Sequence, residues 1–157
     1  MEPRLDFYAV PAAGLALKRF MTVGASFKES SLPAVTRELV ALRVSQINGC
    51  APCVDIHTKE LAAAGETPAR LNLVAVWREA TVFGAAERAA LELAEQGTRV
   101  ADAASGVDDE VWAAAAAQYD EEQLSTLVLL VSFMNAVNRV NVITRRPAGA
   151  DVPGTVR

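Results

Sequence analysis

The chain has 157 residues, a net charge of −4 and a pI near 5.0, which suit one domain with a single core rather than two catalytic domains. Hydrophobic residues make up 52% of the sequence and charged residues 22%, so a disordered chain is excluded. The acidic balance argues against nucleic acid or an acidic membrane surface as a partner, because both attract basic proteins.

The first part of the chain predicts an extended terminus followed by two helices. Residues 1–11 contain prolines, lack the apolar run of a secretory signal and are expected to be extended. A first helix is predicted over residues 12–27. Pro33 marks the start of a second helix, which ends at the turn formed by Asn48 and Gly49.

The middle of the chain predicts three more helices. One begins near Cys50 and ends at Gly65, because glycine suits a left-handed helix cap. The next opens at Pro68 and reaches about Trp77. A fifth helix, with the sequence AAERAALELAEQ, is expected to stop at Gly97.

The last part of the chain predicts a short helix and a long one. Asp108 is a suitable N-cap for the short helix, and the long helix runs from about Asp120 to Ile143. Its apolar stretch, residues 124–137, contains polar residues and is shorter than the ~20 residues that a membrane span needs. It is either the central core helix or is partly covered by another subunit. Residues 145–157 are expected to be an extended or frayed tail.

These elements together predict an all-α fold. No segment shows the sustained two-residue alternation of a half-buried strand. We therefore expect one compact domain of about seven helices over residues 1–157, in a cytoplasmic protein that does not enter a membrane. The chain has two cysteines, and a Cys-x-x-Cys pair in a cytoplasmic protein serves redox or metal chemistry more often than a structural role.

Three side chains of the predicted third helix are the candidates for chemistry. At ~100° per residue, Cys53 lies ~60° around the helix from Cys50, and His57 lies ~40° from Cys53. All three therefore share one narrow arc. Leu61 lies on or beside that arc, so the thiols and the imidazole are expected to face a partly apolar interior pocket.

The start of a helix favours reactive thiols. Its unpaired N–H groups and its dipole stabilise a thiolate at Cys50 or Cys53. His57, one turn beyond Cys53, can accept or return the proton. Two cysteines spaced in this way can also close into a disulfide. The dipole favours Cys50 as the more acidic thiol, whereas the spacing to His57 favours Cys53, so the residues alone leave the order of roles open.

Glu38 is a fourth candidate. Its neighbours one turn away are mostly small or apolar, which predicts that its side chain is buried. A buried carboxylate has either a raised pKa or a cationic partner, which Arg43 or Arg139 could supply. If the second and third helices instead pack antiparallel through the predicted turn, Glu38 could approach the Cys–His arc.

The same four residues also fit roles other than thiol catalysis. A single inward-facing histidine is more often a core residue than a catalytic one. Cys50, Cys53, His57 and Glu38 could instead be four metal ligands, although three ligands on one helix constrain the tetrahedral geometry that zinc prefers. The pair could also form a disulfide in a redox-sensing subunit without catalysis. No G-x-G-x-x-G or Walker motif is present, so no bound organic cofactor is expected.

The spacing E-x11-C-x-x-C-x3-H, formed by Glu38, Cys50, Cys53 and His57, resembles the alkylhydroperoxidase D-like members of the carboxymuconolactone decarboxylase superfamily. The flanking segments ELVALRVSQINGC and VDIHTKELAAAGE fit the same pattern, as do ERAALELAE and LVLLVSFMNAVNRVN. The resemblance covers most of residues 12–145.

This resemblance implies a helical fold and thiol-dependent reduction of organic hydroperoxides. Cys53 would be the peroxidatic thiol and Cys50 the resolving thiol, while Glu38 and His57 would form the proton relay. The reductant would be a dithiol, either a dihydrolipoyl group or a thioredoxin-like protein, and the chain would form a homo-oligomer, a trimer or a hexamer. Pro52 replaces a second histidine of the family's best-known peroxidase, so the relay is expected to differ. Decarboxylating lyases of the superfamily are the alternative, but they typically lack the paired cysteines.

Overall fold

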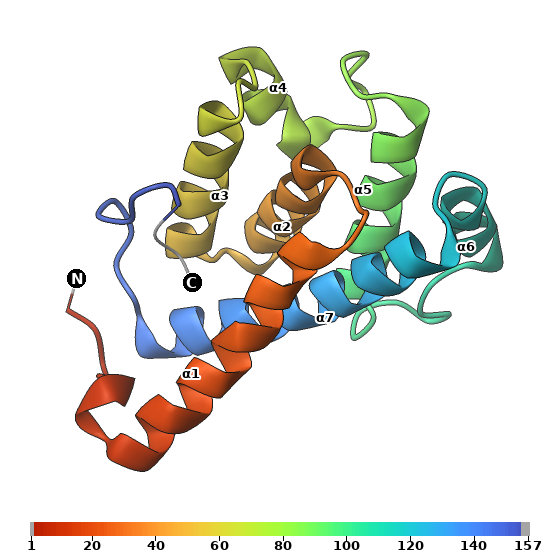
Figure 1. Cartoon of the computed structure of the whole chain (residues 1–157). Helices are drawn as coiled ribbons and strands as arrows, with labels where there is room; N and C mark the ends of the chain where they lie inside the picture. Colours follow the sequence, from red (N-terminus) through yellow and green to blue (C-terminus); the bar gives the residue numbers. More distant parts are fainter. Residues whose placement is uncertain (1, 155–157) are drawn as a thin grey trace.

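The structure is a computed structural model that describes residues 2–154. Within this range the chain forms seven α-helices and no β-strand, which confirms the predicted all-α fold (Figure 1). In chain order the helices are α1 (Pro11–Ser26), α2 (Ala34–Asn48), α3 (Ala51–Ala63), α4 (Pro68–Leu73), α5 (Ala85–Thr98), α6 (Asp109–Ala116) and α7 (Glu121–Thr144).

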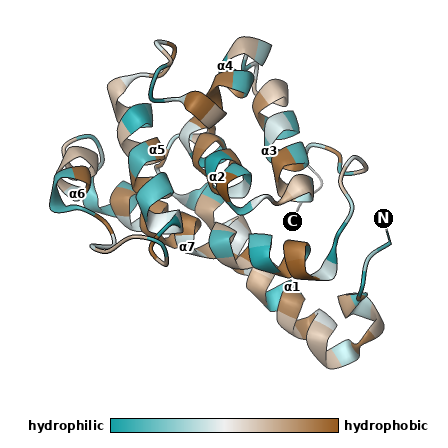
Figure 2. Cartoon of the chain, turned by 180° about the vertical axis from the view of Figure 1, so that it is seen from behind, coloured by the Kyte–Doolittle hydropathy of each residue, from teal (hydrophilic) through white to brown (hydrophobic). Residues whose placement is uncertain are grey.

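The N-terminal segment is less extended than we predicted. The carboxylate of Asp6 accepts a hydrogen bond from the backbone N–H of Tyr8 and caps a 3-10 turn, η1 (Phe7–Ala9). Pro11 then opens α1, where its missing N–H removes no helical hydrogen bond. α1 contains no buried residue and projects beyond the other helices, with apolar residues on its surface (Figures 1 and 2).

α2 and α3 form the helical pair that carries the candidate site. Gly49 ends α2 at a φ of 66°, a left-handed conformation that glycine adopts at little cost, so the predicted turn is confirmed. Cys50 is the N-cap of α3, and Pro52 lies in the first turn of α3. Proline is tolerated there because the first N–H groups of a helix have no helical partner. α2 and α3 then pack against each other.

Of two sequence-based expectations about helix ends, the stop at Gly97 was wrong and the N-cap at Asp108 was confirmed. Gly97 does not stop α5, which continues past it; a Cβ at this position would lie 3.1 Å from Val131 Cγ1, so the glycine allows α7 to pack closely. Asp108 is the N-cap of α6 by position, but its carboxylate accepts hydrogen bonds from Gln96 and Ser105 instead of from the backbone of α6. A tertiary contact therefore overrides the local signal at Gly97.

α7 is the central helix of the core. It packs against α1, α2, α3, α5 and α6, and Leu127 and Asn138 on it are fully buried. With 24 residues it is long and apolar enough to cross a membrane by length and composition alone, a test that a buried core helix also passes. Its buried residues are those of a core helix. Leu129 and Ile143 remain exposed, so a subunit contact there stays a prediction.

A buried ion-pair cluster ties α2 to α5. The carboxylate of Glu95 accepts hydrogen bonds from Arg43 Nη2 at 2.8 Å and from Trp77 Nε1 at 3.1 Å, and it pairs with Arg78 at 2.8 Å. Burial alone would raise the pKa of Glu95, but these three donors lower it from 4.5 to about 2. The position of α2, and of the residues it carries, is therefore fixed from the side opposite α3.

Candidate redox site

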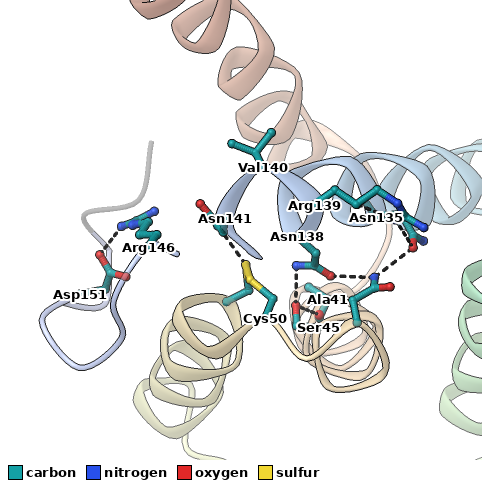
Figure 3. The surroundings of a disulfide bond; sticks show 12 residues. Ala41, Ser45, Cys50, Asn135, Asn138, Arg139, Val140, Asn141, Arg146 and Asp151 are labelled. Atoms are coloured by element: carbon teal, nitrogen blue, oxygen red, sulfur yellow. Dashed lines mark hydrogen bonds and ion pairs between the residues drawn. A yellow bond between two sulfur atoms is a disulfide. The ribbon is translucent and has the colours of Figure 1, made fainter. Parts of the chain in front are cut away.

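Two sulfurs are joined at the start of α3. Cys50 and Cys53 form a disulfide with their Cα atoms 5.4 Å apart, as the spacing of the pair allowed (Figure 3). Both residues are buried, with Cys50 at 0% exposure and Cys53 at 4%. The local cause is the left-handed turn before α3, which places Cys50 outside the helix and Cys53 within its first turn.

Glu38 and His57 form a second pair. His57 Nδ1 lies 2.7 Å from Glu38 Oε2, which joins α2 to α3. The side chains are 18% and 27% exposed respectively, so Glu38 is less buried than its neighbours in sequence predicted. Its partner is neither Arg43, which binds α5, nor Arg139, which binds a residue of its own helix.

The hydrogen bond to Glu38 defines what His57 can do. With Nδ1 engaged by the carboxylate, Nε2 is the ring nitrogen left to exchange a proton. A carboxylate on one ring nitrogen also orients the imidazole. The pair can therefore take up a proton and return it.

Cys53 and His57 line one small cavity of about 80 Å³. Its walls are mainly apolar, and Cys50 is not among its lining residues. A neighbouring cavity of about 140 Å³ is lined by both His57 and Glu38. The predicted arc therefore places one sulfur and the imidazole at a common space. The side chains that surround the first cavity besides Cys53 and His57 are Met21, Pro52, Ile56, Phe133, Met134, Val137, Asn141, Arg146 and Asp151.

Three polar residues of this cavity were missed by the sequence analysis. Asn141 Nδ2 lies 3.2 Å from Cys53 Sγ, and Arg146 Nη2 lies 2.6 Å from Asp151 Oδ1. Asn141 could have been noticed because it follows the buried Asn138 by three residues on α7. The sequence does not show which face of α7 meets α3, so this signal alone would not have placed Asn141 at a sulfur.

The C-terminal segment also differs from the extended tail that we predicted. Residues 145–154 fold back along α3, where Lys59 Nζ donates to the carbonyl of Asp151 at 2.9 Å. The backbone N–H of Gly149 donates to Asp55 Oδ2 at 3.0 Å. This segment therefore supplies part of the cavity wall, whereas residues 155–157 of the predicted tail lie outside the described range.

The four predicted residues are arranged as two pairs. The sulfurs bind each other, and the carboxylate binds the imidazole. Among residues 2–154, no group of three or more His, Cys, Asp or Glu residues is placed to hold a metal ion. Four-ligand binding at these residues would require a different arrangement of their side chains.

The chain is similar to two curated bacterial proteins. Uncharacterized protein YdfG of Bacillus subtilis (strain 168) is 37% identical over 142 residues, which cover 90% of this chain and 94% of that protein. Uncharacterized protein YnjA of Escherichia coli (strain K12) is 35% identical over 121 residues, which cover 77% of this chain and 65% of that protein. These relatives carry no assigned activity in their names.

Two solved structures have the same fold. An Agrobacterium tumefaciens protein of unknown function, proposed to be the antioxidant defence protein AhpD, superposes with a TM-score of 0.88 at 30% identity, over 96% of this chain and 100% of that one. A peroxidase-related protein from Ralstonia eutropha JMP134, described as an alkylhydroperoxidase AhpD core, has a TM-score of 0.76 at 18% identity. The superposition covers 95% of this chain and 92% of the Ralstonia eutropha protein. At this identity the similarity concerns the fold alone.

The family comparison covers the residues that form both pairs. The model of the carboxymuconolactone decarboxylase family matches residues 11–96, a segment that runs from the start of α1 through most of α5 and contains all four predicted site residues. The family predicted from the spacing of the acid, the two cysteines and the histidine is confirmed. The chain belongs to the carboxymuconolactone decarboxylase family and has the alkylhydroperoxidase-like fold.

Proposed function

We propose that this chain is a thiol-dependent peroxidase that reduces organic hydroperoxides through the Cys50–Cys53 pair. The observation that carries the proposal is the shared cavity of Cys53 and His57, with a second sulfur in bonding contact with the first. The apolar walls of this cavity suit the organic part of a hydroperoxide. The likeness to a protein proposed to be antioxidant AhpD supports the same reaction class.

Cys53 is the better candidate for the thiol that meets peroxide. A peroxide must reach the attacking sulfur, and Cys53 lines the cavity whereas Cys50 has 0% exposure. The helix dipole acts on both sulfurs, so it does not outweigh the difference in access. Cys50 then serves as the resolving thiol, because it already lies within bonding distance of Cys53.

The first half of the reaction begins with a proton transfer. The Cys53 thiol gives its proton to His57, which Glu38 holds in place, and the resulting thiolate attacks the terminal oxygen of R–O–OH. The S–O bond forms as the O–O bond breaks, which oxidises Cys53 to a sulfenic acid. The departing alkoxide takes the proton from His57 and leaves as the alcohol.

The second half of the reaction forms the disulfide. The Cys50 sulfur attacks the sulfur of the Cys53 sulfenic acid, and the S–O bond breaks as the S–S bond forms. The hydroxide that departs takes the proton of the Cys50 thiol and leaves as water. An external dithiol then reduces the disulfide by exchange and becomes a disulfide itself. A dihydrolipoyl group or a thioredoxin-like protein fits this role.

The test uses the fact that the chain has only two cysteines. Purified wild type, Cys53→Ser and Cys50→Ser are compared for consumption of cumene hydroperoxide with dihydrolipoamide as the dithiol. The proposal predicts turnover by wild type and background rates for both variants, because each lacks one step of the cycle. A Cys53→Ser variant that retains the wild-type rate would refute the assigned nucleophile.

The oligomeric state, the lyase alternative and the cellular location remain predictions. The exposed apolar residues of α1 and α7 are the surfaces that a trimer or hexamer would cover, and sedimentation of the purified protein measures the subunit number. The decarboxylating lyase alternative predicts loss of carbon dioxide from a lactone acid at rates that do not depend on either cysteine. A cytoplasmic location also stays an expectation from the sequence.

A further inference from the structure

A buried amide from another helix contacts the sulfur that faces the cavity. Asn141 on α7 is 9% exposed, and its Nδ2 donates a hydrogen bond to Cys53 Sγ at 3.2 Å (Figure 3). The amide donates to the sulfur of Cys53 and not to that of Cys50. The two sulfurs therefore differ in their contact with this donor as well as in their access to the cavity.

This contact has a chemical consequence once the disulfide is reduced. A donor aimed at a thiolate favours the charged form, and hydrogen bonds to ionised groups are shorter and stronger than those between neutral groups. The other residues that line the cavity beside Cys53 include apolar side chains, which disfavour a charge. We propose that Asn141 is a positioning residue that stabilises the Cys53 thiolate and so makes Cys53, rather than Cys50, the reactive thiol.

The charged groups around Cys53 have partners besides the sulfur, whereas Asn141 is an uncharged donor to it. His57 lines the cavity from α3, where its Nδ1 is engaged by Glu38 of α2 and its Nε2 is left for proton exchange. Arg146 and Asp151 line it from the C-terminal segment and form an ion pair with each other at 2.6 Å. Each charge in the cavity wall thus has a partner of its own. Asn141 can be replaced by an apolar residue without a change in the net charge of the site.

The same contact biases the redox equilibrium of the pair. A thiolate accepts the Asn141 hydrogen bond more strongly than a disulfide sulfur does, so the amide favours the reduced state over the oxidised state. A pair whose reduced state is stabilised is a stronger oxidant. The amide therefore also favours reduction of the Cys50–Cys53 disulfide by the external dithiol. Stabilisation of the Cys53 thiolate does not depend on the reaction that the chain catalyses. Only the effect of Asn141 on turnover rests on the proposed peroxidase function.

The direct test uses chains with one thiol each. Asn141→Leu, which keeps the side-chain size and removes the donor, is placed in Cys50→Ser, where Cys53 is the one thiol, and in Cys53→Ser, where Cys50 is. The rate of alkylation by iodoacetamide is then measured against pH. We expect Asn141→Leu to raise the pH midpoint of Cys53 alkylation by about one unit. Below the midpoint, this shift leaves about tenfold less thiolate on Cys53. The midpoint of Cys50 stays unchanged.

The controls separate this role from a general loss of structure. Asn135→Leu removes a neighbouring amide of α7 that bonds Thr98 instead of a sulfur, and it should leave both midpoints in place. If Asn141→Leu does not fold, as judged by circular dichroism, Asn141→Ala is used in the same two backgrounds. An unchanged Cys53 midpoint in a folded variant, or equal shifts at both cysteines, would overturn the inference.

The effect on turnover is measured separately. With cumene hydroperoxide and dihydrolipoamide, Asn141→Leu should lower kcat/KM about tenfold at neutral pH and approach wild type above the shifted midpoint. A loss that is the same at every pH would indicate a structural defect and would overturn the assigned role. If the wild-type chain shows no peroxidase turnover, the proposed function fails, while the alkylation experiment still decides the role of Asn141.

Discussion

Replacement of Glu95 by glutamine tests the cluster that anchors the site-bearing helix α2. The folded chain lowers the pKa of Glu95 from 4.5 to about 2, and at about 1.36 kcal/mol per pH unit this corresponds to roughly 3 kcal/mol of stability at pH 7. Glutamine keeps the size and one acceptor of Glu95 but leaves Arg43, which is 9% exposed, without a counter-charge. We expect Glu95→Gln to lose about 2 to 3 kcal/mol of unfolding free energy at neutral pH.

The sign of the pH dependence follows from the lowered pKa of Glu95. Its stabilisation is fully present above the unfolded value of 4.5 and is lost as the pH falls through that value toward about 2. Urea unfolding followed by circular dichroism at pH 7, 5 and 3 should therefore show the gap between wild type and Glu95→Gln narrowing as the pH falls.

A matched control for this experiment lies on α5, the helix that carries Glu95. Glu92 forms a more exposed ion pair with Arg78, whose side chain is 48% exposed, so Glu92→Gln should cost less than about 1 kcal/mol. A Glu95→Gln loss no larger than that of Glu92→Gln would refute the reasoning. So would a loss of equal size at pH 3 and pH 7.

Two further variants test the site itself. A Cβ at Gly24 would lie 2.6 Å from ring carbons of Phe133, so Gly24→Ala must displace a wall of the Cys53 cavity. We expect kcat/KM to fall several-fold more for cumene hydroperoxide than for hydrogen peroxide, and equal losses for the two peroxides would contradict this. Glu38→Gln keeps the shape beside His57 but removes the charge, and kcat/KM should fall on the order of 10- to 100-fold. An unchanged peroxidase rate would exclude a relay through this pair.

Local sequence signals predicted most of the helical architecture because they act within a few residues. Pro68 and Gly49 mark helix ends through backbone geometry, and the structure has them at those places. Gly97 carries the same kind of signal but serves close packing against α7 instead. The sequence cannot distinguish these two uses of glycine, because the second depends on a helix more than 20 residues away.

The candidate site was predictable where its residues lie on adjacent helices. The spacing of Cys53 and His57 on α3 was enough to place both at one cavity, and the short turn before α3 brought Glu38 to His57. Asn141 and Arg146 were not predictable, because their place depends on how α7 crosses α3 and where the C-terminal segment returns. The apolar neighbours of Glu38 also misled the prediction of its burial, since its carboxylate points to a half-buried histidine.

The most direct test of the proposed mechanism is to identify which sulfur peroxide oxidises. Reduced Cys50→Ser and reduced Cys53→Ser are each treated with one equivalent of cumene hydroperoxide in the presence of dimedone, which traps sulfenic acids, and are then analysed by mass spectrometry. We expect a dimedone adduct on Cys53 in the first variant and little or none on Cys50 in the second. Equal adduct formation on the two cysteines, or none on Cys53, would contradict the mechanism.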